Sequence, residues 1–137
     1  MSGIILGLLL SLSCSKDETD DQKPVINLVS PAEMDEFLPG TTIPFEATFT
    51  DDKSLNQFKI NIHFDDGHDH KSVIGHYDAW NYEFVGQLSG TAQEINMEID
   101  IPEELTHGAY HFLVFCTDEV GNESFVAIDI HIEDDHD

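Results

Sequence analysis

From Pro24 onward, apolar and polar residues alternate in short runs that are bounded by Pro, Gly, Asn and Asp. A period of two is typical of β-strands that bury one face, and no window longer than about ten residues shows a helical period. Such short, evenly spaced strands predict an all-β protein, an antiparallel sandwich or barrel without a repeat or a second domain. The expected strands are residues 25–29, 42–50, 57–64, 71–76, 80–86, 93–101, 109–117 and 124–132.

The N-terminus carries a different pattern, an apolar run of nine residues at Ile4–Leu12. It is too short to span a bilayer and is followed at once by Ser13 and Cys14. A short apolar segment that ends in a small residue and a cysteine resembles a bacterial lipoprotein signal peptide. The resemblance implies cleavage before Cys14 and a diacylglyceryl group on its thiol, which is a lipidation site.

The segment after Cys14 is polar and acidic. Residues 15–18, SKDE, resemble the short Lys-acidic signal that sends many Bacteroidetes lipoproteins to the outer face of the outer membrane. A plain acidic linker over residues 15–23 is the alternative interpretation, and the two are compatible. The expected organisation is a signal peptide at 1–13, a lipidated acidic tether at 14–23, one β-sandwich domain at 24–133 and an acidic tail at 134–137.

The charge balance restricts the partners. The chain has 28 acidic residues against 5 Lys and Arg, all of them lysines, and a formal net charge of −23. Such a surface repels phosphate backbones and anionic headgroups, which argues against nucleic acid and leaves the lipid anchor as the expected membrane contact. It also attracts cations, although acidity alone is a common means of keeping a protein soluble.

Two stretches resemble a known fold. Residues 39–64, PGTTIPFEATFTDDKSLNQFKINIHF, resemble the B strand, loop and C strand of bacterial immunoglobulin-like (Ig-like) modules. Residues 101–122, IPEELTHGAYHFLVFCTDEVGN, resemble their E–F corner, F strand and turn. With the loop HFDDGHDH at 63–70, the chain over about residues 24–133 resembles a Bacteroidetes family of Ig-like surface lipoproteins built on a domain of unknown function. The resemblance implies a single Ig-like β-sandwich and no established activity.

Alternation assigns the faces, because residues i and i+2 of a strand point to the same side. Strand 109–117 is apolar on both faces, and we place Tyr110 inside because Ig-like modules usually bury the aromatic residue after the E–F glycine. Cys116 is then predicted to be a small buried core residue. The expected inner positions are Phe58, Ile60, Ile62, Phe64, Tyr110, Phe112, Val114, Cys116, Val126, Ile128, Ile130 and Ile132.

Histidines gather at one end of this sandwich. In an Ig-like fold the end of strand 57–64, the start of 109–117 and the end of 124–132 meet, and the outward residues there are His63, His111 and His131. If Thr117 pairs with Phe125 across the turn, His111 lies directly opposite His131, with Cβ atoms about 4.5–5.5 Å apart. The loops with His68, His70 and His107 open at the same end.

Neutral imidazoles beside carboxylates suit Zn²⁺ or Cu²⁺, whereas Ca²⁺ prefers oxygen ligands. We expect the metal ligands His63, His111 and His131, with His68 or His70 completing or covering the site and His107 nearby. The three aspartates of the loop would ligate directly or orient the imidazoles from outside, namely Asp65, Asp66 and Asp69. An equally open interpretation is that these histidines are solvated or pair with neighbouring carboxylates.

Two further groups have a structural and a functional interpretation. Asp51–Asp52 and the turn 118–122 have Ca²⁺-binding residue types, although aspartates more commonly shape tight turns. Trp80 with Tyr77 and Tyr82 has the composition of a sugar-stacking platform, although packing against the sandwich is the commoner role of such residues.

Two functions therefore compete. The first is a surface-tethered lipoprotein that binds zinc or copper(II), as an accessory to an outer-membrane transporter. The second is a structural or interaction module whose acidic surface or Trp80 region binds a protein or glycan. No catalytic motif is recognisable, so we do not expect an enzyme.

Overall fold

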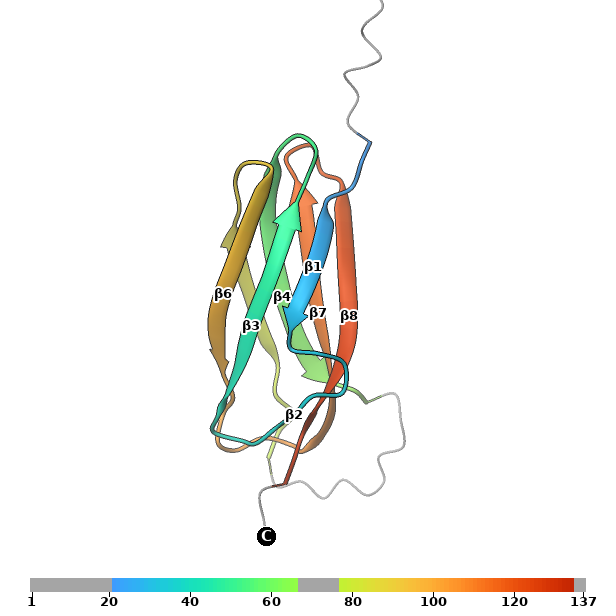
Figure 1. Cartoon of the computed structure of the whole chain (residues 1–137). Helices are drawn as coiled ribbons and strands as arrows, with labels where there is room; N and C mark the ends of the chain where they lie inside the picture. Colours follow the sequence, from blue (N-terminus) through green and yellow to red (C-terminus); the bar gives the residue numbers. More distant parts are fainter. Residues whose placement is uncertain (1–20, 67–76, 135–137) are drawn as a thin grey trace, which may run out of the picture.

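The computed structural model describes residues 21–66 and 77–134, and these residues form eight β-strands (Figure 1). Within them, no helix is long and apolar enough to cross a membrane. The strands are β1 (Val25–Ser30), β2 (Glu36–Phe37), β3 (Thr42–Thr50), β4 (Leu55–Phe64), β5 (Tyr82–Gln87), β6 (Ala92–Asp100), β7 (Gly108–Asp118) and β8 (Glu123–Ile132).

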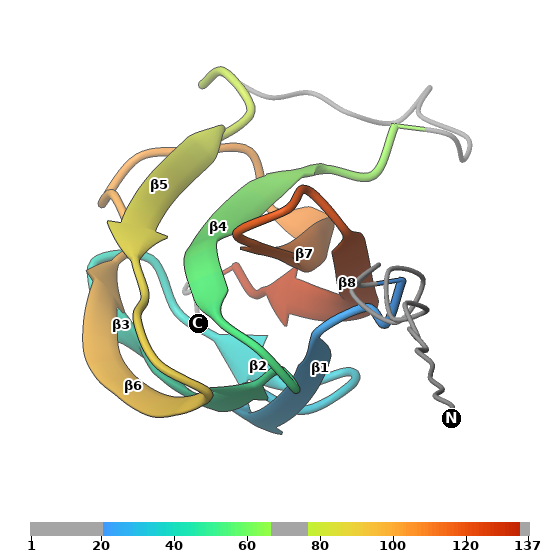
Figure 2. The same cartoon turned by 90° about the horizontal axis from the view of Figure 1, so that it is seen from above.

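The strands build two facing sheets, as Figure 2 shows along the strand direction. Sheet A has the order β1-β3-β6, and sheet B has the order β2-β8-β7-β4-β5. The pairing of β2 with β8 is parallel, and the other strand pairs are antiparallel. The predicted all-β, Ig-like antiparallel sandwich is therefore confirmed.

Two strands differ from the sequence prediction. The short strand β2 was not expected, because two residues are too few to show an alternating pattern. It carries the chain from sheet A to sheet B after the cis Ser30–Pro31 peptide bond. The expected strand 71–76 lies outside the described residues, and the expected strand 80–86 is β5, which begins at Tyr82.

One hydrophobic core fills the space between the sheets. Its centre is a set of phenylalanine rings, in which the Phe45 centroid lies 6.1 Å from Phe58 and 6.2 Å from Phe112. The inner face of β5 adapts to this packing at Gly86, where a Cβ atom would come within 2.3 Å of the Phe58 ring. A glycine is therefore required opposite that ring.

The predicted facing of the strands is confirmed at nine of the inner positions, which are fully or almost fully buried. These are Phe58, Ile60, Ile62, Tyr110, Phe112, Val114, Cys116, Ile130 and Ile132. The other three, Phe64, Val126 and Ile128, are only half-buried. Val126 and Ile128 lie on the part of β8 that has no strand on its far side, since β2 pairs only with His131 and Ile132.

Tyr110 ties the start of β7 to the loop before it. Its hydroxyl donates a hydrogen bond to the Thr106 carbonyl at 2.7 Å and accepts one from the Trp80 amide at 3.1 Å. Burial raises the pKa of Tyr110, and the hydrogen bond from Trp80 partly offsets that effect. This is the tyrosine corner of Ig-like sandwiches.

Buried aspartates shape the turns at the opposite end. The Asp118 carboxylate accepts hydrogen bonds from the backbone amides of Val120 and Asn122, at 3.2 and 2.8 Å. The Asp51 carboxylate accepts them from Lys53 and Ser54, at 3.0 and 2.9 Å. Both residues therefore act as the turn-forming aspartates that the sequence favours over calcium ligands.

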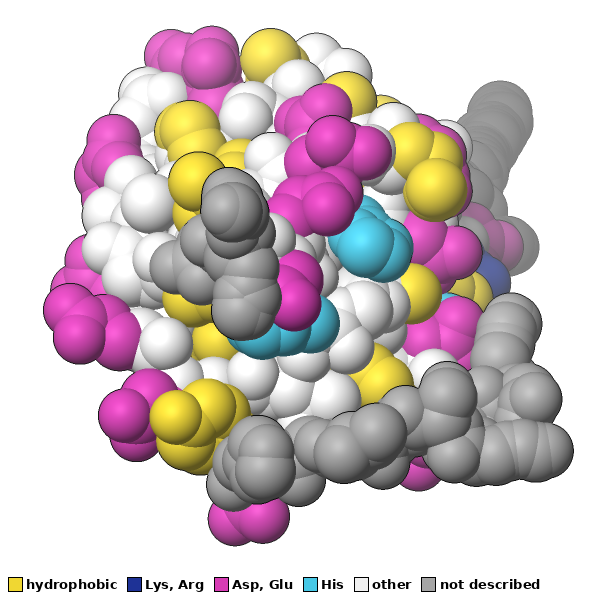
Figure 3. All heavy atoms as spheres, turned by 90° about the horizontal axis from the view of Figure 1, so that it is seen from below, with side chains coloured by type: hydrophobic (Ala, Val, Ile, Leu, Met, Phe, Trp, Pro, Cys, Tyr) yellow, Lys and Arg dark blue, Asp and Glu magenta, His cyan; other side chains and the backbone are white. Residues whose placement is uncertain are grey.

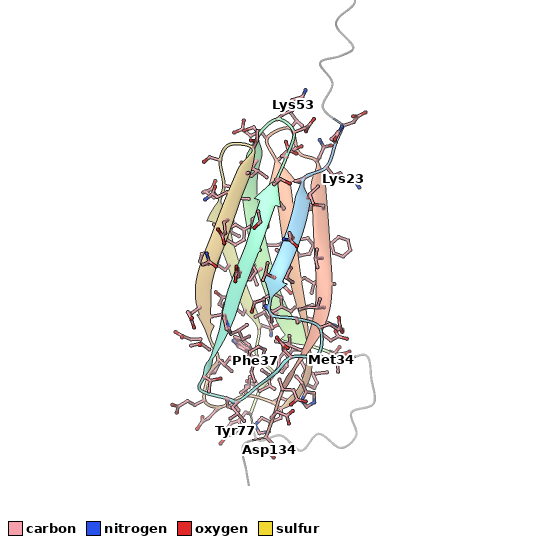
Figure 4. All side chains as sticks on the ribbon, in the orientation of Figure 1. Lys23, Met34, Phe37, Lys53, Tyr77 and Asp134 are labelled. Carbon is pink, nitrogen blue, oxygen red and sulfur yellow. The ribbon has the colours of Figure 1, made fainter. Side chains whose placement is uncertain are left out.

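The chain enters the sandwich at this same end. The Ser124 hydroxyl donates to the Pro24 carbonyl at 2.7 Å, and the Asn122 amide donates to the Gln22 carbonyl at 3.2 Å. Figure 4 shows Lys23 at this end, and Tyr77 and Asp134 at the other. The N-terminal segment thus joins the domain at the end opposite the histidines.

Candidate functional site

The outer side chains of sheet B line up in rows across β8, β7, β4 and β5, because the four strands are paired in register. One such row, which we call the histidine row, consists of Asp129, His111 and His63. His63 and His111 are direct cross-strand partners, with ring centroids 5.3 Å apart and planes at 66°. The structure therefore brings these two predicted ligands together.

Oxygen atoms hold both imidazoles of the histidine row. His63 Nδ1 lies 2.7 Å from Asn61 Oδ1, and His111 Nδ1 lies 2.8 Å from Asp129 Oδ1. When both Nδ1 atoms donate, both Nε2 atoms keep the lone pair with which a neutral imidazole binds a metal. His111 Nε2 lies 3.3 Å from a carboxylate oxygen of Asp65.

The predicted pairing of His111 with His131 is wrong. Across β7 and β8, His111 pairs with Asp129, and His131 pairs with Ala109. The turn is tighter than expected, because the Asp118 amide donates to the Asn122 carbonyl and the Asp118 carboxylate binds the amides inside the turn. The register therefore shifts by two residues, which leaves His131 on the outer face but beyond the histidine row.

The remaining predicted site residues are spread around the same end (Figure 3), where histidine side chains lie next to carboxylates. His131 Nδ1 lies 3.3 Å from Glu133 Oε2, without the geometry of a hydrogen bond, and His107 Nδ1 lies 3.8 Å from Asp134. Asp66 is exposed. The predicted residues Cys14, His68, Asp69 and His70 lie outside the described residues.

These distances do not amount to a preformed metal site. Among residues 21–66 and 77–134, no three His, Cys, Asp or Glu side chains are grouped so that they could hold a metal ion. The contacts that are present are imidazole–carboxylate pairs, at His107, His111 and His131. This is the arrangement that the second interpretation of the histidines predicts.

The next rows of sheet B have a different chemistry. We call Phe125, Phe115, Lys59 and Val85 the aromatic row, since they are consecutive partners across the four strands. The Phe115 and Phe125 rings are 5.8 Å apart, and Phe125 and Val85 are 61% and 48% exposed. Between the aromatic row and the histidine row lie Ala127, Leu113, Asn61 and Glu83.

The apolar residues of these rows are exposed or half-buried, with Lys59 between Phe115 and Val85. We call them the apolar patch: Phe125, Phe115, Val85, Leu113 and Ala127. Contiguous exposed apolar surface commonly marks an interaction site on a soluble domain. One feature of the sequence indicated the patch, namely that both faces of residues 109–117 are apolar. Nothing in the sequence indicated Phe125 or Val85, since each is a single apolar residue on an outer face.

Lys59 lies at the centre of the aromatic row. Its ammonium group is 5.0 Å from the centre of the Phe115 ring and 3.5 Å from a carboxylate oxygen of Glu83. A shallow hollow of about 70 Å³ opens beside it, lined by Gln57, Phe58, Lys59, Phe115, Thr117 and Glu123. The hollow has room for the end of one side chain of a bound molecule.

Two other candidates from the sequence have structural roles. Trp80 is only 9% exposed and packs on Tyr82 and Tyr110, with ring centroids 5.9 and 6.1 Å away, so it offers no face for sugar stacking. The Cys116 thiol is fully buried, and burial, with added repulsion from Asp51 and Asp118, raises its pKa to about 12. It is therefore not a nucleophile at physiological pH.

Solved structures with a similar fold come from three bacteria. The fibronectin(III)-like modules of Clostridium thermocellum CbhA match with a TM-score of 0.48 and 14% identity, covering 79% of this chain and 94% of that chain. The sporulation control protein Spo0M of Bacillus subtilis matches with a TM-score of 0.56 and 10% identity, covering 82% of this chain and 50% of Spo0M. A β-glucosidase of Listeria innocua matches with a TM-score of 0.43 and 10% identity, covering 78% of this chain and 16% of the enzyme.

At 10% identity the likeness to Spo0M concerns the fold alone. The chain spans only half of Spo0M and a small part of the β-glucosidase. No curated protein matches the chain in sequence. The family model described as Domain of unknown function (DUF4625) matches residues 12–133, and the chain therefore belongs to the DUF4625 family.

Proposed function

We propose that the chain is a lipid-anchored, non-catalytic Ig-like module that binds another protein through the outer face of sheet B. The observation that carries this proposal is the apolar patch, in which Phe125 and Val85 are 61% and 48% exposed. Aromatic residues and a low density of charge are the features that distinguish the centres of protein interfaces from other surface.

The contrast with sheet A supports the choice of face. The outer residues of β6 include Glu94, Glu98 and Asp100, all exposed, and β3 adds Glu46. The outer positions of β4 and β7, at the centre of sheet B, hold no carboxylate from Gln57 to His63 or from Ala109 to Thr117. In a chain of net charge −23, that difference makes the centre of sheet B easier to desolvate than the outer face of β3 and β6.

Selection from a library of displayed random peptides tests this function. We expect peptides selected on the full chain to lose binding to a Phe115→Ser/Phe125→Ser variant and to keep binding to a Val25→Ser/Val29→Ser variant. The control removes two apolar residues, 61% and 50% exposed, from the edge of sheet A, whereas in the first variant Phe125 is also 61% exposed and Phe115 is half-buried. Selected peptides that bind the Phe115→Ser/Phe125→Ser variant as tightly as the wild type would contradict the proposed face.

The anchor is proposed at Cys14, on the outer face of the outer membrane. The sequence supports it through the apolar run before Cys14, and the entry of the chain beside the β7–β8 turn would point the opposite end away from the membrane. Cys14→Ala should move the protein from the membrane fraction to the soluble fraction. A protein that stays in the membrane fraction would refute the anchor.

A second candidate function is the binding of zinc or copper(II), supported by one observation. His63 and His111 are cross-strand partners whose Nδ1 atoms each face an oxygen, and a metal bound by both Nε2 atoms would have to enter between His111 Nε2 and Asp65, which are 3.3 Å apart. A third ligand would come from Asp65 after rotation of the imidazoles. A role as accessory to an outer-membrane transporter belongs to this candidate.

Titration of Zn²⁺ and of Cu²⁺ tests the second candidate. If it holds, His63→Ala/His111→Ala should weaken binding at least about tenfold, whereas His107→Ala should not. Binding should also weaken in acid, because protonated imidazoles cannot bind a metal. Equal weak binding by all three proteins would mean that the acidic surface alone attracts the ions.

A further inference from the structure

We infer that the partner of the apolar patch is a protein surface with an apolar centre and a rim of lysine or arginine. The inference rests on the proposed function and specifies the chemistry of the partner. It follows from the size of the patch, from the charges around it and from the hollow beside Lys59.

The patch is too small to be a whole interface. From Phe125 to Val85 it spans four strands, roughly 14 Å between the outer strand axes, and two rows of outer residues span roughly 7 Å along the strands. A stable interface buries roughly 800 Å² on each side, so the patch can supply only its centre. The surrounding surface must therefore also meet the partner.

That surrounding surface is acidic. Glu123 and Glu83 flank the patch on β8 and β5, and Asp129 follows Ala127 on the outer face of β8. Lys59 is the cation within the rows, and its ammonium group already contacts Glu83. Charges at the rim of an interface select the partner by complementarity, and here they select a cationic rim.

The net charge of the whole chain also favours a cationic partner. A net charge of −23 draws a cationic protein toward the surface and repels a second copy of this chain. Two copies that met patch to patch would also bring Glu83, Glu123 and Asp129 of both chains into one rim. A homodimer through this face is therefore disfavoured.

The hollow beside Lys59 gives the patch a point of attachment. The residues that line it include the aromatic Phe115 and the polar Gln57, Thr117 and Glu123. A partner side chain that enters it would pack on the ring and meet hydrogen-bonding groups at its end. The hollow lies between the aromatic row and the row of Gln57, Thr117 and Glu123, so a side chain that fills it would bind at the margin of the patch.

Three short peptides separate the contributions of charge and of apolar contact. The probe is acetyl-Lys-Phe-Leu-Phe-Lys-amide, and its two controls replace either the three central residues by Ser or both lysines by Glu. Binding is measured by NMR titration of the isotopically labelled full chain at physiological salt. We expect shifts at the amides of Lys59, Phe115 and Phe125, and a Kd at least about fivefold lower for the probe than for either control.

Variants locate the binding. Phe125→Ser and Phe115→Ser/Phe125→Ser should each raise the Kd of the probe at least about fivefold, whereas Val25→Ser/Val29→Ser should leave it unchanged. The single variant keeps the test valid if the double variant unfolds, since Phe125 is 61% exposed. Fivefold tighter binding with this dependence on Phe125 supports the inference.

Each other outcome overturns it in a distinguishable way. If the Glu peptide binds as tightly as the probe and Phe125→Ser abolishes both, the proposed function stands and the basic partner does not. If the Ser peptide binds as tightly as the probe, only charge is involved and both proposals fail. Sedimentation that shows a dimer of the full chain, lost in Phe125→Ser, would make a second copy the occupant.

Discussion

The inner and outer faces of sheet B come from alternating residues of the same strands, yet they differ in how deeply their side chains are buried. On β7, the inner residues Tyr110, Phe112 and Val114 have no solvent exposure, while the outer residues His111, Leu113 and Phe115 are half-buried. The inner residues touch sheet A, and the outer residues have no layer above them among the described residues. Stability should therefore depend on the inner face and binding on the outer one.

The two faces also treat polar groups differently. Inside, Asp118 and the Tyr110 hydroxyl have fixed hydrogen-bond partners in the backbone. Outside, Lys59 and His111 contact side chains that are themselves partly exposed. Exposed ion pairs contribute little to stability, whereas a buried group that loses its partner costs much. The comparison leads to five predictions, ordered by the expected change in stability.

The sharpest comparison uses two neighbouring residues of β7. Phe112→Ala should lower the free energy of unfolding by about 3–5 kcal/mol, because it removes a ring from the centre of the core and leaves a cavity. Leu113→Ala should cost about 1 kcal/mol or less, since its side chain faces outward. Denaturant unfolding of both variants measures the difference, and equal costs would refute the assigned facing of β7.

At the end of β7, the comparison is between two aspartates. Asp118→Ala should cost about 2–3 kcal/mol, because the backbone amides of Val120 and Asn122 lose a buried acceptor. Asp129→Ala, on the outer face, should cost about 0.5–1 kcal/mol, although His111 Nδ1 loses its contact with a carboxylate. Similar midpoints for the two variants in urea would show that the turn does not depend on the carboxylate.

A smaller effect is expected at the tyrosine corner. Tyr110→Phe should cost about 1–2 kcal/mol, because the Trp80 amide loses an acceptor and the Thr106 carbonyl loses a donor. Tyr82→Phe serves as the control for the loss of a tyrosine hydroxyl elsewhere in sheet B. Equal unfolding temperatures for the two variants would show that the hydrogen bonds of Tyr110 do not stabilise the fold.

The buried thiol of β7 should make stability depend on alkaline pH. The unfolded Cys116 thiol loses its proton near pH 9.0, whereas the folded thiol keeps it up to about pH 12, so stability falls as the pH rises from 9 toward 12. At pH 10 the wild type should lose roughly 1 kcal/mol more, relative to pH 8, than a Cys116→Val variant. Equal losses would show that other groups cause the alkaline destabilisation.

The smallest change in stability is expected on the apolar patch. Phe125→Ser should alter the free energy of unfolding by about 0.5 kcal/mol or less, because the ring is already 61% exposed. The same substitution should abolish binding of the peptides selected on the wild type. A variant that loses several kcal/mol would show that Phe125 belongs to the fold and not to a binding surface.

Much of this molecule follows from the sequence alone. Alternation within 57–64 identified Ile60 and Ile62 as inner residues, because burial on one face imposes a period of two. Strand 109–117 is apolar on both faces, and only the resemblance to Ig-like modules placed Tyr110 and Phe112 inside. The acidity of the chain follows from composition. The resemblance to a family of unknown function followed from the residues around the E–F corner and the histidine loop, and the family match supports it to that extent.

Other features needed the tertiary structure. A shift of two residues between β7 and β8 keeps every side chain on its own face, so the hydrophobic pattern cannot distinguish His111 opposite His131 from His111 opposite Asp129. The Asp118 carboxylate decides the register by closing the turn with its hydrogen bonds. Phe125, Phe115, Lys59 and Val85 likewise come from four strands and form one row only after every register is set, and a single strand contains no information about its neighbour's position.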